Sequence, residues 1–66
     1  MNVIVNGQPV ELSDGATTAA AVRVLTSAAS GIAVAVNGEV VRRGAWESTV
    51  LADGDRIEVL TAVQGG

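Results

Sequence analysis

The segment VIVNGQPV (residues 3–10) returns in similar form as VAVNGEVV (residues 34–41), displaced by 31 positions (34 minus 3). In both copies an Asn-Gly pair separates two short runs rich in β-branched residues. Asn-Gly supplies the positive φ angles that a two-residue type I′ turn requires, and the twist of that turn matches its flanking strands. Each copy therefore predicts a β-hairpin. Two copies are too few for a solenoid, which needs about three or more repeats.

Pro9 indicates which position in the sheet the second strand of the first hairpin takes. Proline has no N–H to donate, so it is excluded from the interior of a central strand. The sequence therefore predicts an edge position for this strand.

A single helix is predicted between the hairpins, from about residue 17 to residue 29. It follows the turn pair Asp14-Gly15, and the hydroxyl of Thr17 or Thr18 can cap its first free amides. Gly31, after Ser30, can take the left-handed conformation that closes a helix.

This helix is expected to be amphipathic, with its apolar side on one face of the sheet. At about 100° per residue, Ala21, Leu25 and Ala28 share one face. Val22 and Val24 lie at the margins of that face, while Arg23 points away.

The second half of the chain predicts a final strand and a short tail. The polar segment RRGAWES (42–48) carries the only tryptophan, and residues 49–51 are expected to form a short strand or turn before Asp53-Gly54. Polar and apolar residues alternate in RIEV (56–59), as in a strand with one solvated face, and residues 60–63 can extend it. Residues 64–66 then remain as a flexible C-terminal diglycine tail after a domain of residues 1–63.

The order strand, strand, helix, strand, strand, strand favours an α+β architecture. The helix buries its apolar face most simply if the last strand returns beside the first in parallel, in the centre of a mixed sheet. This arrangement is the β-grasp (ubiquitin-like) fold, with a mixed four- to five-stranded sheet and one helix packed on one face.

Composition argues against catalysis by this chain alone. Its 66 residues suffice for one domain, and it contains no cysteine and no histidine. Disulfides, thiolate metal sites and the commonest general base are therefore absent from the sequence. It also has no P-loop motif for a nucleotide, so no catalytic residue, metal site or cofactor bound by this chain is expected.

The charge and hydropathy of the chain indicate a cytoplasmic protein without nucleic-acid or membrane partners. The net charge is −3 with 4 basic residues, which gives no electrostatic footprint for phosphate backbones or anionic lipid. No apolar run approaches the roughly 18 residues of a membrane-spanning helix, and no signal peptide is recognisable.

Three other features each allow two interpretations. Arg42-Arg43 is either a contact for an acidic partner or, as we favour, a solvated pair. Trp46 is either an interface anchor or a cap on the small core. Asp53-Gly54-Asp55 lacks the remaining ligands of a calcium loop, so a turn is favoured over a metal site.

The pair Gly65-Gly66 makes the terminal carboxylate the best candidate for chemistry. Gly66 has no side chain beside its acyl carbon, and Gly65 gives the backbone access to conformations closed to other residues. Such a tail can thread a narrow enzyme channel. The alternatives are chance in a glycine-rich chain or a linker.

The second half of the chain resembles a known family in four places: the Val-Asn-Gly-Glu-Val-Val turn, the Trp46-Glu47-Ser48-Thr49 stretch, the Asp53-Gly54-Asp55 turn and the diglycine ending. On these motifs the chain resembles the sulfur carrier proteins of thiamine biosynthesis, a small bacterial β-grasp family. The resemblance covers nearly the whole length, and the second half is its most specific part. The chain departs from these proteins at Ala19-Ala20-Ala21, where the family often has a leucine-rich helix.

The resemblance implies a carrier acted on by partner enzymes. A ubiquitin-activating-like adenylyltransferase, using ATP and Mg, would adenylate Gly66. A sulfur donor such as a cysteine desulfurase or a rhodanese-type protein would convert it to a thiocarboxylate, which delivers sulfur to thiazole synthase. Gly65, Gln64 and Val63 would thread the tail and contact partners, and the free carrier would be a monomer.

Three alternatives to this function remain open. The small subunit of molybdopterin synthase uses an equivalent tail on the same fold. A ubiquitin-like modifier would instead join Gly66 to lysines of other proteins. A β-grasp interaction module would make no use of the diglycine.

Overall fold

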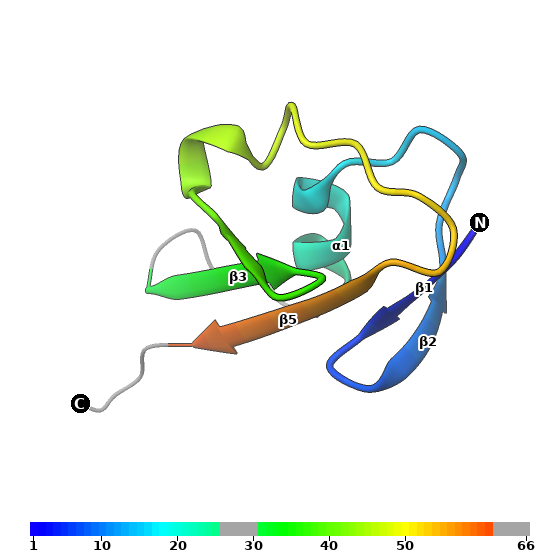
Figure 1. Ribbon diagram of the computed structural model, residues 1–66, viewed down its shortest axis with the longest axis horizontal. Coiled ribbons are helices and arrows are strands. Elements are labelled where there is room, and N and C mark those ends of the chain that lie inside the picture. Colours follow the sequence, from blue (N-terminus) through cyan, green and yellow to red (C-terminus); the bar gives the residue numbers. More distant parts are fainter. Residues whose placement is uncertain (26–30, 62–66) are drawn as a thin grey trace.

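Five strands form one mixed sheet with the order β2-β1-β5-β3-β4, as seen in a computed structural model that describes residues 1–25 and 31–61 (Figure 1). The strands are β1 (Asn2–Val5), β2 (Gln8–Glu11), β3 (Ile32–Val36), β4 (Glu39–Val41) and β5 (Arg56–Thr61). Helix α1 (Thr18–Leu25) follows β2, and a 3₁₀ helix, η1 (Arg43–Ala45), follows β4. Strand β5 is central, parallel to β1 and antiparallel to β3. The predicted β-grasp architecture is confirmed.

Both predicted hairpins form around their Asn-Gly pairs. The φ angles are 50° at Asn6 and 81° at Gly7, and 52° at Asn37 and 87° at Gly38. These positive values are those of a type I′ turn. Strand β2, which contains Pro9, lies at one edge of the sheet, so that prediction is also confirmed.

Helix α1 begins at Thr18, but the predicted side-chain cap is wrong. The amides of Thr18 and Ala19 donate instead to the backbone carbonyls of Thr49 (2.9 Å) and Trp46 (3.1 Å). The Thr18 hydroxyl also donates to the Thr49 carbonyl, at 3.2 Å. Because the segment after η1 supplies these acceptors, the helix needs no hydroxyl cap. Residues 26–29 of the predicted helix, and Ser30 at its expected end, lie outside the described residues. Gly31 has a φ of 72°, the left-handed conformation that was predicted for it.

The buried face of α1 differs from the predicted one. Ala21 and Val22 are buried, as are Thr18 and Ala19 at the start of the helix. Leu25, expected at the centre of the apolar face, is 48% exposed, so that prediction is wrong. The core lies beneath the first turns of the helix, and Leu25 lies at the last described turn, beyond it. Ala28 lies outside the described residues.

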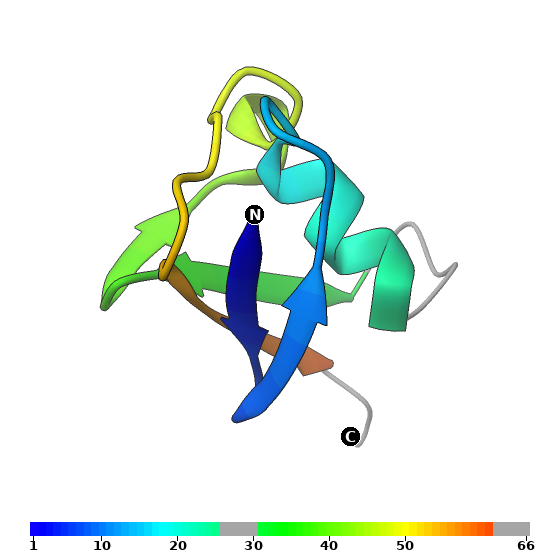
Figure 2. The ribbon, with the colours of Figure 1, turned by 90° about the vertical axis from the view of Figure 1, so that its right-hand side faces the viewer.

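The core lies between the sheet and the layer formed by α1 and the segment from η1 to β5. In Figures 1 and 2 this layer covers one side of the sheet. Strand side chains Val3, Val5 and Ile57 are at most 1% exposed, and Trp46 and Leu51 complete the core from the covering segment. Isolated bridge pairing of Val50 with Thr17 ties that segment to the chain just before α1.

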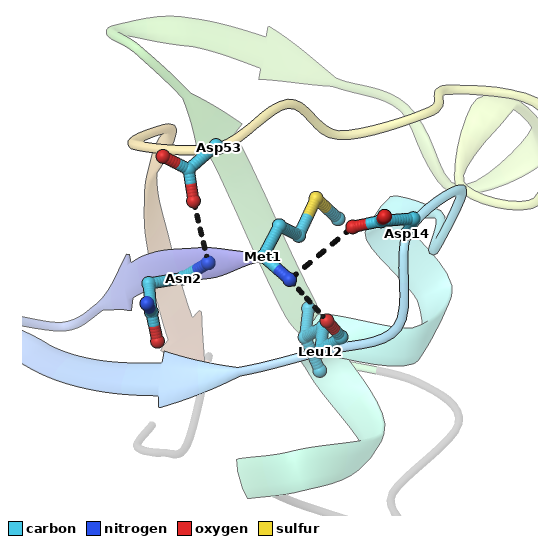
Figure 3. A network of polar contacts seen from close by, with 5 residues as sticks. All are labelled: Met1, Asn2, Leu12, Asp14 and Asp53. Carbon is cyan, nitrogen blue, oxygen red and sulfur yellow. Dashed lines mark hydrogen bonds and ion pairs between the residues drawn. The ribbon is translucent and has the colours of Figure 1, made fainter.

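A network of polar contacts fastens the start of β1 to both neighbouring turns (Figure 3). The amino group of Met1 donates to the Leu12 carbonyl at 2.8 Å and contacts the Asp14 carboxylate at 3.3 Å. The Asn2 amide donates to Asp53 Oδ1 at 2.7 Å. The turn that precedes β5 is thereby attached to the strand with which β5 pairs.

Candidate functional site

Strand β5 is the element that leads to the predicted site. It lies between β1 and β3, and its described part ends at Thr61. The predicted site residues Val63, Gln64, Gly65 and Gly66 lie outside the described residues. The structure describes the strand that precedes them, β5, and the contacts that hold this strand.

The acidic turn before β5 binds main-chain groups. The Ala52 amide donates to Asp55 Oδ2 at 2.8 Å, and the Asn37 carboxamide donates to Asp55 Oδ1 at 2.9 Å. Both hydrogen bonds hold the pKa of the Asp55 carboxyl below its usual value, and the bond from the Ala52 backbone amide has the larger effect. With Gly54 at a φ of 87°, the segment forms the turn that was favoured. Across residues 1–25 and 31–61, no three acidic side chains gather as metal ligands would.

Two asparagines hold β5 through their side chains, a role that sequence reasoning missed. Asn6 makes a pair of hydrogen bonds with Val59: Oδ1 accepts from the Val59 amide at 2.8 Å, and Nδ2 donates to the Val59 carbonyl at 3.0 Å. Asn37 Oδ1 accepts from the Arg56 amide at 3.0 Å. The recurring Asn-Gly pair was the available signal, but it was interpreted only as a turn.

The face of the sheet turned away from α1 is a partly apolar surface that carries β5 along its middle. In the described part of the chain, no other element covers this face (Figures 1 and 2). Ile4, Leu60 and Val40 are 37%, 68% and 81% exposed. Two shallow hollows there share Glu58 and Leu60 in their linings. We call Ile4, Val40, Glu58 and Leu60 the outer face.

Trp46 belongs to the core, so its interpretation as an interface anchor is wrong. Its side chain is buried, and Nε1–H donates to the Val41 carbonyl at 2.9 Å. The Arg43 guanidinium lies 5.8 Å from the centre of the indole ring, within the range of a cation–π contact. Contact of Arg42-Arg43 with an acidic partner stays untested. Within the described ranges, no helix has the length and apolar character of a membrane span.

The fold and the sequence that follows β5 define a class of protein: a small β-grasp protein whose central strand leads toward a diglycine. Residues 3–66 match the model of the ThiS family, and the chain belongs to that family. The resemblance found in the second half of the sequence is confirmed.

Known proteins similar to this chain match it over its whole length. It is 29% identical, over 66 residues and the full length of both chains, to the sulfur carrier protein ThiS of Escherichia coli (strain K12). The crystal structure of the thiamine biosynthesis protein ThiS from Geobacter metallireducens matches with a TM-score of 0.81 and 33% identity, covering 100% of both chains. A solution structure of a thiamine biosynthesis protein from the same organism matches with a TM-score of 0.70 and 33% identity. This match covers 100% of this chain and 88% of that chain.

Proposed function

We propose that this protein is a sulfur carrier of thiamine biosynthesis and that its C-terminal Gly66 carries the sulfur. The observation that supports this proposal most strongly is the family match, which extends from residue 3 through Gly66. The full-length similarity to a named sulfur carrier agrees with it. The central position of β5, the strand that precedes the predicted site residues, fits a domain that presents these residues to other proteins.

The chemistry begins with activation of the carboxylate, because its oxygen is a poor leaving group. A carboxylate oxygen of Gly66 attacks the α-phosphorus of ATP, pyrophosphate leaves, and an acyl-adenylate forms. The outer sulfur of a cysteine persulfide on a donor protein then attacks the carbonyl carbon, AMP leaves, and an acyl disulfide forms. A thiol attacks the donor's cysteine sulfur, so that the S–S bond of the acyl disulfide breaks and a new disulfide forms between the thiol and the donor cysteine. The product is a thiocarboxylate at Gly66, which supplies sulfur to thiazole synthase.

Partner enzymes perform each of these steps, and the carrier is a cosubstrate that is consumed and regenerated. The sequence has no cysteine or histidine to serve as nucleophile or general base. An adenylyltransferase of the ubiquitin-activating type binds the ATP and Mg, and a cysteine desulfurase or rhodanese-type protein supplies the sulfur. Gly65, Gln64 and Val63 pass through the enzyme channel, where the absence of a side chain at Gly65 gives the carbonyl access.

The proposal is tested by intact-mass measurement after incubation with an activating enzyme, ATP and a sulfur source. We expect the mass to rise by the difference between one sulfur and one oxygen atom. A variant lacking Gly66 should keep its fold and gain no sulfur. An unchanged mass for the complete chain, with a partner shown to be active on another carrier, would contradict the proposal.

A genetic test separates this function from the alternatives. Deletion of Gly66 should abolish thiamine-independent growth, and growth that survives the deletion would favour an interaction module. Loss of molybdopterin synthesis instead of thiamine synthesis would favour the molybdopterin-synthase type of carrier. Covalent adducts with other proteins that depend on Gly66 would favour a modifier.

A further inference from the structure

The last rung of hydrogen bonds between β1 and β5 is made by a side chain. The backbone supplies the earlier rungs: the Ile4 amide donates to the Asp55 carbonyl at 2.9 Å, and the Asn6 amide donates to the Ile57 carbonyl at 2.9 Å. At Val59, both the N–H and the C=O are bonded to the Asn6 carboxamide, at 2.8 Å and 3.0 Å. A carboxamide offers the same acceptor and donor as a peptide unit. Asn6 thus continues the ladder after its own backbone has turned into β2.

The equivalent asparagine of the second hairpin holds the opposite end of the same strand. Asn37 accepts from the Arg56 amide at 3.0 Å and donates to the Asp55 carboxylate at 2.9 Å. Its backbone has almost the same φ as that of Asn6, 52° against 50°. The two turns therefore hold β5 at two places: Asn37 at Arg56, its first residue, and Asn6 at Val59, two residues before its described end.

The end of β5 depends on Asn6 because β1 does not reach it. Backbone pairing with β1 stops at Val5 and Ile57, whereas pairing with β3 continues to Ile32 and Thr61. Among the described residues, Asn6 supplies the contact with Val59 on the β1 side. Among the described strands, loss of its carboxamide leaves this part of β5 paired with β3 alone.

We propose that Asn6 is a positioning residue for transfer at Gly66. By fixing Val59, it sets the direction in which β5 delivers the following residues to the active site of the activating enzyme. Reaction rates fall steeply when a reacting group is displaced, by roughly 100-fold for about 1 Å. This inference rests on the proposed function.

The test compares Asn6→Gly with Asn37→Gly in the complete chain. Glycine accepts the positive φ of both turns, so each variant keeps its turn and loses the side-chain bonds. Initial rates of pyrophosphate release by the activating enzyme, measured over a range of carrier concentrations, give kcat and KM. We expect Asn6→Gly to lower kcat about tenfold with little change in KM, and Asn37→Gly to leave kcat within about twofold of wild type.

Amide hydrogen exchange provides a second readout. Exchange at Val59 should accelerate in Asn6→Gly and stay slow in Asn37→Gly. If Asn6→Gly does not fold, Asn6→Asp replaces it: the aspartate keeps an acceptor for the Val59 amide but places an oxygen against the Val59 carbonyl. We expect this variant also to lose kcat.

Three outcomes would overturn the inference. The first is an unchanged kcat in the Asn6 variant that folds, and the second is an equal loss in the Asn6 and Asn37 variants after correction for the folded fraction. In both cases the wild type is still adenylated, so the proposed function stands. The third is a wild type that is not adenylated at all, which overturns the proposed function and this inference together.

Discussion

Asp55 makes the stability of the turn before β5 dependent on acid. The Ala52 amide and the Asn37 carboxamide bind its ionised form and lower its pKa in the folded protein. Its contribution to the free energy of unfolding is therefore complete above the unfolded pKa of about 4, and it is lost as the pH falls through the lower, folded value. We expect Asp55→Asn to remove this part of the acid destabilisation, as measured by urea unfolding between about pH 2 and pH 6.

Asn37→Gly serves as the intermediate case for this prediction. It removes the second of the two hydrogen bonds and leaves the first, that of the Ala52 amide. The acid dependence should then lie between those of wild type and Asp55→Asn. Identical pH profiles for wild type and Asp55→Asn would show that the lowered pKa makes no contribution to stability.

The two Asn-Gly pairs show what the sequence can predict about single residues. Their positive φ angles follow from local chemistry, so both turns were predictable. The bond from Asn6 to Val59 joins residues 53 positions apart, and it exists only because β5 lies beside β1. The side-chain role of Asn6 therefore depends on the register of a distant strand, which no local pattern specifies.

At the scale of elements, the segment around η1 is attached to the core through Trp46. Its indole is 7% exposed and donates to the Val41 carbonyl at 2.9 Å. We expect Trp46→Ala to cost about 3–5 kcal/mol of unfolding free energy, because it leaves a large cavity. In a domain of this size such a loss is a large part of the total stability.

Trp46→Phe separates the hydrogen bond from the packing. Phenylalanine fills part of the volume but leaves the Val41 carbonyl without its indole donor, so we expect a loss of about 1–3 kcal/mol. Circular dichroism during thermal unfolding measures both variants, since the only fluorescent indole is removed. Equal losses of unfolding free energy in Trp46→Ala and Trp46→Phe would mean that the hydrogen bond contributes more than the packing.

Helix α1 shows what a sequence pattern cannot predict about the packing of a helix. Periodicity places Leu25 on the same side of the helix as Val22, yet Val22 is buried and Leu25 is 48% exposed. The angle around a helix axis says which side faces the sheet, but not how far along the axis the core extends. The cap was missed for a related reason, since its acceptors come from residues 46 and 49.

At the scale of the whole molecule, the proposed function makes the outer face the expected contact surface for the activating enzyme. Glu58 and Leu60 of this face belong to β5, the strand that precedes the predicted site residues, and Leu60 is 68% exposed. Burial of apolar side chains contributes most at the centre of an interface. We expect Leu60→Lys to weaken binding to the adenylyltransferase about tenfold or more, as measured by calorimetry.

Val50→Lys is the matched control for this prediction. Val50 is 63% exposed, close to the value for Leu60, but it lies on the covering segment on the other side of the sheet. The variant should therefore bind as wild type does. If both substitutions weakened binding equally, the effect would be one of charge and not of the outer face.

The overall topology was predictable because the hairpin, helix and strand patterns agreed with one another. Pro9 placed its strand at an edge, and a last strand in the centre of the sheet left few other strand orders. The candidate site was predictable only in part. Gly66 stays a prediction from composition and family resemblance, whereas the asparagines that hold β5 and the outer face required the assembled sheet.

Of the strands that the structure describes, the central one is synthesised last. Each hairpin closes through local contacts, but β5 joins them, with pairs such as Ile4 and Arg56 far apart in sequence. Ile57 and Val59, two of the core residues, arrive with it. On the ribosome, Val3, Val5 and Val34 stay without their main partner until residues 56–61 have been synthesised, and an interrupted chain exposes them to proteases and chaperones. A chain whose synthesis stops before residue 56 therefore lacks the strand that joins the two hairpins, and its sheet cannot close.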